Sequence, residues 1–197
     1  MPIEIFLALV VFAFTTSITP GPNNMMLFAS GVNFGFMRTI PHMIGIGAGF
    51  LSLLLAVGFG LGAILDSVPL LYTALKFLGG AYLVWIAWKI ATSDTLSEGK
   101  AGGRPMTFLE AAAFQWVNPK AWVMAVSAMA TYTMPANYTA SVLLVGVAFA
   151  LVNVPSVSTW AGFGSALREW LSVPARLKAF NVSMALLLVA SLWPMLR

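Results

Sequence analysis

The stretch "TPGPNN", residues 19–24, interrupts a long apolar run near the start of the chain. Both of its prolines lack a backbone N–H and disrupt helical geometry, and both of its asparagines add polar amides among apolar neighbours. A straight helix over 3–33 would measure about 46 Å at about 1.5 Å per residue, whereas the hydrocarbon core of a bilayer is about 30 Å thick. We therefore predict one membrane crossing that is broken or kinked at this stretch.

The composition indicates that the solvent around this protein is lipid. Of its 197 residues, 60% are apolar and 8% are charged, whereas soluble domains are about 25% charged. The chain has no cysteine and one histidine, which excludes disulfides, thiolate catalysis and a cysteine- or histidine-rich metal site. We expect a bilayer around the helices, and no metal, cofactor or nucleic-acid partner.

The hydropathy pattern predicts an all-α integral membrane protein with six transmembrane helices, over residues 3–33, 39–65, 69–91, 107–132, 138–166 and 177–196. Arg38 and Pro41 are expected to mark the first turn. The polar stretch at 93–106 is typical of a connector. We predict a single membrane domain, 1–197, made of a first repeat at 1–92, the connector, and a second repeat at 107–197.

A second interruption, "QWVNPKAW" at 115–122, falls within the fourth predicted span. Each interruption is followed at a similar distance by a Leu-Lys pair, at 75–76 and at 177–178, which opens or lies in the third span of its half. Three spans per half make the halves face opposite ways, as in transporters built from inverted repeats. The alternative is that two unrelated proline kinks coincide.

Broken helices expose backbone N–H and C=O groups at membrane depth, where protein or a polar cavity must receive them. The N–H groups that open a half-helix suit a carboxylate, and freed carbonyls or side-chain amides suit an ammonium. The candidate binding residues are therefore the groups at the two breaks, with one amide from the fifth span: Thr19, Pro20, Gly21, Pro22, Asn23, Asn24, Gln115, Asn118, Pro119, Lys120 and Asn153.

Lys120 is the one charge that we predict deep in a span, and such a residue is a functional candidate. It could hold a carboxylate or exchange a proton; the alternative is that it extends toward the headgroups. No aspartate or glutamate lies deep in a predicted span, and His42 is a weaker candidate for ion coupling. Small residues of the second span form one helix face that suits a sliding surface, a dimer contact or static packing: Gly45, Gly49, Ser52, Ala56 and Gly60.

Lysine and arginine counts predict the orientation. With the N-terminus outside, seven basic residues lie at cytoplasmic ends and two lie outside, which favours both termini outside. The seven are Arg38, Lys89, Lys100, Arg104, Arg168, Arg176 and Lys178, and the two are Lys76 and Arg197.

Four features together resemble the LysE/RhtB family of amino-acid exporters. They are "TPGPNNMM" in the first span, the glycine-rich second span, "LKFLGGAYLVWIAWKIATS" at 75–93 and "NPKAW" at 118–122. Within the family they are most similar to the branch that exports cysteine and O-acetylserine. The resemblance implies a secondary exporter of small neutral amino acids or their derivatives in the bacterial cytoplasmic (inner) membrane. It also implies coupling to the proton gradient. We expect transport by alternating access, and we expect no catalytic residues.

Several alternatives stay open. The cargo could be of the threonine, homoserine or leucine type, the flux could run through a channel or inward, and copies of the chain could form a homo-oligomer. A non-transporting membrane scaffold would use the same kinks only structurally. An intramembrane enzyme would need a nucleophile–base or carboxylate pair at mid-depth, and the sequence offers none.

Overall fold

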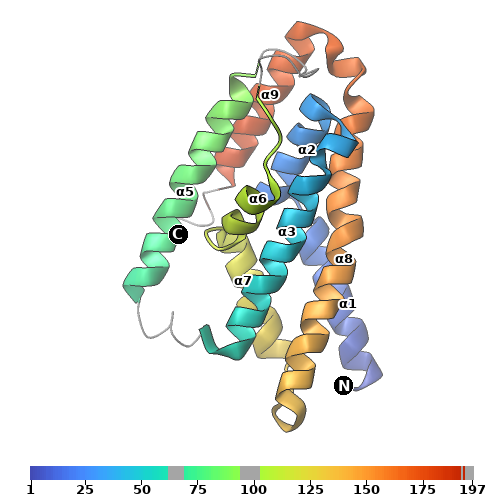
Figure 1. Ribbon diagram of the computed structural model, residues 1–197, viewed down its shortest axis with the longest axis vertical. Coiled ribbons are helices and arrows are strands. Elements are labelled where there is room, and N and C mark those ends of the chain that lie inside the picture. The colour runs from blue at the N-terminus through green and yellow to red at the C-terminus, as the bar shows by residue number, and fades with distance from the viewer. Residues whose placement is uncertain (62–68, 94–102, 192, 194–197) are drawn as a thin grey trace.

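The computed structural model of the chain describes residues 1–61, 69–93, 103–191 and 193, and this part is helical without strands (Figure 1). The α-helices of the first half are α1 (Ile3–Ile18), α2 (Pro22–Phe34), α3 (Phe36–Ala56) and α5 (Pro69–Ala91), with a π-helical turn η1 (Val57–Leu61) after α3. Those of the second half are α6 (Phe108–Gln115), α7 (Pro119–Tyr132), α8 (Tyr138–Leu167) and α9 (Pro174–Ala190). The short 3-10 turns η2 (Pro135–Asn137) and η3 (Trp170–Ser172) flank α8.

The helices confirm the apolar, all-helical class that the sequence predicts. Two helical stretches, Phe36–Leu61 and Pro135–Leu167, are long and apolar enough to cross a bilayer. The pair α1 and α2 passes the same test as one unit, bent by 55° at its break, so the described helices supply two crossings, or three if this pair counts as one. The predicted interruption of the first helix is thus present, and α6 and α7 are separated at the second predicted interruption.

The first turn does not lie where the sequence analysis expects it. The chain reverses at Gly35, whose φ of 81° belongs to the region that favours glycine. Arg38 and Pro41 instead lie inside α3, which begins at Phe36. Proline is tolerated there because its missing N–H removes one hydrogen bond near the start of a long helix that packs against several others.

Helices from the two halves pack against each other throughout the bundle. The most extensive contacts join α2 to α8, α3 to α6, α5 to α9, and α8 to both α3 and α1. Figure 1 shows α5 and α9 side by side, with α3 and α8 running along the other side of the bundle. Contacts between helices of the first and second halves of the chain therefore run along the bundle.

Glycines allow the closest of these helix contacts. An added Cβ on Gly45 or Gly49 would collide with the backbone of α6, at Phe108 and Ala112 respectively. Ser52, on the same face, accepts a 3.2 Å hydrogen bond from Nε1 of Trp116. The small-residue face of α3 is therefore covered within the chain at these positions, so it is not a dimer contact there.

The outward faces of the long helices are apolar. On α8, Leu143, Val147 and Leu151 are exposed, while Val145 and Phe149 on the other side are completely buried. Exposed aliphatic stripes of this kind suit lipid rather than water. This arrangement leaves the polar side chains of the helix breaks pointing inward.

Candidate functional site

The first helix break lies between Ile18 and Pro22, and its freed carbonyls are bonded by a side chain. The amide nitrogen of Asn24 donates to the carbonyl oxygens of Ser17 (2.8 Å) and Thr19 (2.9 Å). Because a continuous helix would have bonded these oxygens to backbone N–H groups, Asn24 replaces the helix at this point. Within the described part of the chain no side chain caps the start of α2, so its first N–H groups remain available.

At the second break, between Gln115 and Pro119, side chains also bond to freed backbone groups. The Asn118 side chain accepts a 3.1 Å hydrogen bond from the backbone N–H of Lys120 and thereby caps α7. Pro119 takes the first helical position, where a missing N–H costs nothing. The freed carbonyl of Trp116 accepts a 2.8 Å bond from Nε1 of Trp122.

The two breaks meet, although they are far apart in sequence. Nζ of Lys120 donates a 2.7 Å hydrogen bond to the carbonyl oxygen of Thr19. Asn23 and Gln115 form a reciprocal amide pair, in which Asn23 Nδ2 donates to Gln115 Oε1 (2.8 Å) and Gln115 Nε2 donates to Asn23 Oδ1 (3.0 Å). Side chains of both halves therefore build one polar cluster at the level of the breaks.

A small cavity, the mid-helix pocket, lies beside this cluster and has a volume of about 30 Å³. Seven of the predicted residues line it: Gly21, Asn23, Asn24, Gln115, Asn118, Lys120 and Asn153. Thr19 contributes its carbonyl oxygen, whereas Pro20, Pro22 and Pro119 shape the breaks without lining the pocket. Pro155, which the sequence analysis pairs with Asn153, is exposed within α8 and does not line it.

Two buried oxygens at the mid-helix pocket have no hydrogen-bond partner among the described residues: Oγ of Ser17 and Oδ1 of Asn153. An unpaired buried polar atom is costly, and both of these residues line the mid-helix pocket. The sequence analysis missed Ser17, although it lies one helical turn before Gly21. It also missed the apolar walls from α3, Ile46 and Phe50.

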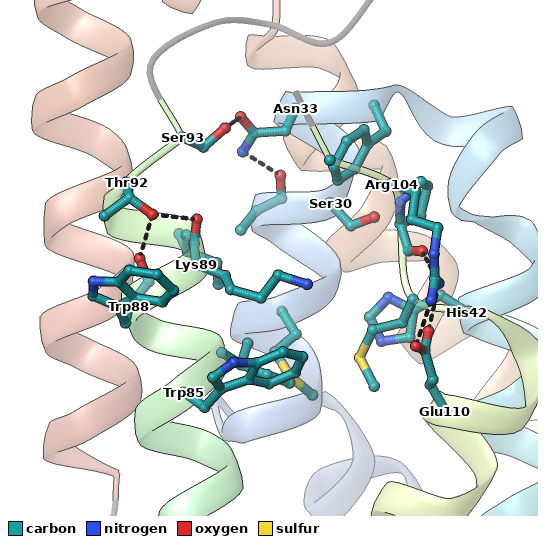
Figure 2. Close-up of a pocket in the computed structure, with 18 of the residues that line it drawn as sticks. Ser30, Asn33, His42, Trp85, Trp88, Lys89, Thr92, Ser93, Arg104 and Glu110 are labelled. Atoms are coloured by element: carbon teal, nitrogen blue, oxygen red, sulfur yellow. Dashed lines mark hydrogen bonds and ion pairs between the residues drawn. The ribbon is translucent and has the colours of Figure 1, made fainter. Parts of the chain in front are cut away.

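A second and larger cavity, the end cavity, opens near the end of the bundle where α2 ends and α6 begins. Its volume is about 490 Å³, and α2, α3, α5, α6 and residues 103–106 contribute to its walls. Figure 2 shows Lys89 extending from α5 into this space and His42 lying close to Arg104 and Glu110. The two cavities share α2, α3 and α6 as walls. On each of these helices, the residues that line the end cavity lie about one turn from those that line the mid-helix pocket.

An ion pair borders the end cavity at the start of α6. Arg104 donates to both oxygens of Glu110, each at 2.6 Å. Glu110 also accepts from the backbone N–H of Thr107, whose hydroxyl accepts from the Glu110 N–H, and this reciprocal capping box starts the helix. The hydrogen bonds that the Arg104 guanidinium donates to the Glu110 carboxylate raise the pKa of Arg104 above its ordinary value, so Arg104 stays charged.

An apolar helical bundle in which two broken helices meet at a polar pocket is an arrangement found in membrane transporters. Comparison with known families agrees: residues 14–191 match the family described as LysE type translocator. The chain belongs to this family, which confirms the predicted resemblance and identifies a transport protein rather than an enzyme.

The relatives of the chain include bacterial proteins named cysteine/O-acetylserine efflux protein. Those of Escherichia coli strain K12 and Shigella sonnei strain Ss046 are each 34% identical over 182 residues, which cover 90% of this chain and 90% of the relative. The protein of Escherichia coli O139:H28 is 33% identical over the same length. No solved structure gives a significant match.

Proposed function

We propose that this protein is a secondary exporter of small neutral amino acids or their derivatives, of the cysteine and O-acetylserine type, that works by alternating access. The observation that carries the proposal is the contact between the two helix breaks, in which Lys120 donates to the Thr19 carbonyl. The printed names of the relatives support the cargo class, and the breaks supply the chemistry that such a cargo needs.

The mid-helix pocket offers groups for both charges of a zwitterion. Lys120 and the uncapped N–H groups of α2 suit the carboxylate. The unpaired oxygens of Ser17 and Asn153 suit the ammonium. Because the Thr19 carbonyl already accepts from Lys120 and Asn24, an arriving carboxylate would draw Lys120 away and free that carbonyl for the cargo ammonium.

The volumes of the two cavities support a transport cycle. About 30 Å³ accommodates only about one or two water molecules, so the mid-helix pocket is closed to cargo in this state. The end cavity, at about 490 Å³, falls within the range of about 300–1,000 Å³ typical of ligand sites. We infer that the breaks must separate for the cargo to enter between them, and that the end cavity is the open side.

Six spans in two inverted repeats form part of the proposal, with repeats at 1–92 and 107–197 and the connector at 93–106. In such an arrangement the first, second and third crossings of one half correspond to those of the other. The contacts support this, because α1 packs on α8 as α6 packs on α3, and α5 packs on α9. The close approach of Gly79 on α5 to the Val117 carbonyl links the third crossing to the opposite break.

We further propose that the protein lies in the bacterial inner membrane with both termini outside and the end cavity facing the cytoplasm. Arg38, Lys89 and Arg104 lie near that end. Cytoplasmic segments of membrane proteins carry an excess of lysine and arginine, which supports this orientation. Proton coupling completes the proposal, with Lys120 as the titratable group that changes partner during the cycle. A homo-oligomer would use the exposed apolar helix faces.

Efflux from loaded proteoliposomes tests the proposal. Vesicles would be loaded with labelled O-acetylserine, cysteine, threonine, homoserine, leucine or lysine, with and without a pH gradient. We expect O-acetylserine and cysteine to leave fastest and the gradient to accelerate them. If only threonine, homoserine or leucine leaves the vesicles, the assignment of the cargo is wrong but the exporter is supported. If no amino acid leaves, a membrane scaffold is favoured.

A further inference from the structure

The end cavity contains a buried side chain that nothing in the fold explains. His42 is 1% exposed, and neither of its ring nitrogens has a hydrogen-bond partner among the described residues. A neutral imidazole carries one donor and one acceptor, and leaving both unpaired in the interior costs stability. The ring lines the end cavity, but neighbouring atoms cover both of its nitrogens, so a ligand in that cavity bonds to them only when those neighbours shift.

The polar groups around His42 do not satisfy it, because they bond to one another. Ser30 and Thr39 share a 2.9 Å hydrogen bond, and Thr39 also donates to the Gly35 carbonyl. Arg104 and Glu110 are joined by two hydrogen bonds. The imidazole therefore stands among groups that are already paired.

The cavity walls carry both signs of charge near this ring. Lys89 reaches into the cavity with its ammonium 4.4 Å from the centre of the Trp85 ring. On the side of His42 lies Glu110, whose Oε1 accepts one described hydrogen bond, from Arg104, and so keeps a lone pair for another donor. A cation and an acceptor that face one space suit a small zwitterion.

We propose that the end cavity is a separate first binding site for the amino-acid cargo, in which His42 and Lys89 hold the α-carboxylate and Glu110 accepts from the α-ammonium. The inference rests on the proposed function. It adds that cargo binds before the breaks separate, one turn away from the mid-helix pocket on α2, α3 and α6.

Because the chain has no cysteine, a single introduced thiol reports on the cavity. Ser30→Cys lines the end cavity, and Ser172→Cys is an exposed control on η3, outside it. The full chain in proteoliposomes would be treated with a small maleimide, with O-acetylserine or threonine as the thiol-free probe. At a probe concentration of about ten times Kd, mass action predicts labelling of Ser30→Cys about tenfold slower, and no change at Ser172→Cys.

Two further variants in the Ser30→Cys background separate binding from folding. His42→Leu should keep or raise Tm, since it removes an unpaired buried polar group, yet it should abolish protection by the probe. His42→Gln should restore part of the protection. Lys120→Met should slow efflux about 10- to 100-fold while protection persists, because the mid-helix pocket is a different site.

The outcomes distinguish this inference from the proposed function. Normal efflux without protection of Ser30→Cys, or full protection in His42→Leu, would overturn the first binding site and leave the exporter intact. Loss of protection in Lys120→Met would show that the two cavities are one site and would also overturn it. Absence of both efflux and protection for every amino acid would refute the exporter itself.

Discussion

The ammonium nitrogen of Lys120 lies 2.7 Å from the carbonyl oxygen of Thr19, so a side chain of the second helix break bonds to the backbone of the first. Asn24 donates to the same oxygen at 2.9 Å. The carbonyl that the break releases is thus bonded twice, once from within its own half and once from the other half. Any separation of the two breaks must exchange the Lys120 bond for another.

Replacement of this lysine should slow transport without unfolding the protein. A hydrogen bond to a charged group contributes about 1.5–3 kcal/mol, so efflux of O-acetylserine by Lys120→Met should fall about 10- to 100-fold. The measurement is the initial efflux rate per reconstituted molecule. Lys178→Met, on the exposed face of α9, is the matched control; an equal loss in both variants would argue that general charge matters instead.

The reciprocal amides of Asn23 and Gln115 should be energetically coupled. A double-mutant cycle with alanine at both positions should give a coupling energy of about 0.5–2 kcal/mol, the range of buried hydrogen bonds between membrane helices. Reversible unfolding in mixed micelles would measure it. Asn23 with Asn181 is the control pair, because Asn181 bonds instead to Asn33 and Ser93. Additive behaviour of Asn23 and Gln115 would contradict the pairing.

Two glycines of α8 should respond oppositely to alanine. A Cβ on Gly164 would collide with the Phe28 carbonyl of α2, whereas a Cβ on Gly162 meets nothing within 4 Å. Gly164→Ala should therefore destabilise by about 1–3 kcal/mol through overpacking, and Gly162→Ala should be neutral or stabilise by up to about 1 kcal/mol. Tm in detergent distinguishes them, and similar shifts for both would rule out the close α2–α8 contact.

The start of α6 should depend more on its cap than on its ion pair. Loss of a threonine N-cap costs about 0.5–2 kcal/mol, whereas an exposed ion pair contributes about 0–1 kcal/mol. Hydrogen exchange at the Glu110 N–H, which donates to the Thr107 hydroxyl, should therefore accelerate more in Thr107→Ala than in Arg104→Ala. The reverse order would mean that the ion pair, rather than the capping box, holds this end of the helix.

Maleimide labelling of two single-cysteine variants tests the proposed orientation of the chain in the membrane. Asn137→Cys on η2 and Ser172→Cys on η3 are both exposed and lie at opposite ends of α8. An impermeant maleimide added to intact cells should label Asn137→Cys at once and Ser172→Cys only after permeabilisation. The opposite pattern would place both termini in the cytoplasm.

The positions of the helix breaks could be predicted from the sequence because proline acts locally. Wherever proline removes an N–H, the helix must end or restart, and Pro22 and Pro119 each take the first position of a new helix. The turn at Gly35 was predicted a few residues too late, at Arg38 and Pro41. The positive φ of that glycine is a property of the folded chain, which prolines near a helix start do not reveal.

His42 and Ser17 show what the sequence could not supply. The sequence predicts His42 at the membrane border. In the structure, the packing of α3 against α2 and α6 buries it, and both of its nitrogens have no partner among the described residues. In the sequence, nothing distinguishes Ser17 from the other small residues of an apolar helix. In the structure, its hydroxyl lies at the mid-helix pocket without a partner among the described residues. Whether a buried polar atom finds a partner depends on the neighbouring helices, which the local sequence does not specify.

By itself, the sequence determined the lipid-facing class, the two breaks and the residue types gathered around them, because hydropathy and proline geometry act over a few residues. Only the tertiary structure decided that Lys120 bonds to Thr19, that Asn23 pairs with Gln115, and that a small pocket lies at the breaks and a larger cavity near the end of the bundle. These features arise from contacts between helices about a hundred residues apart, where packing decides which freed backbone and side-chain groups find each other.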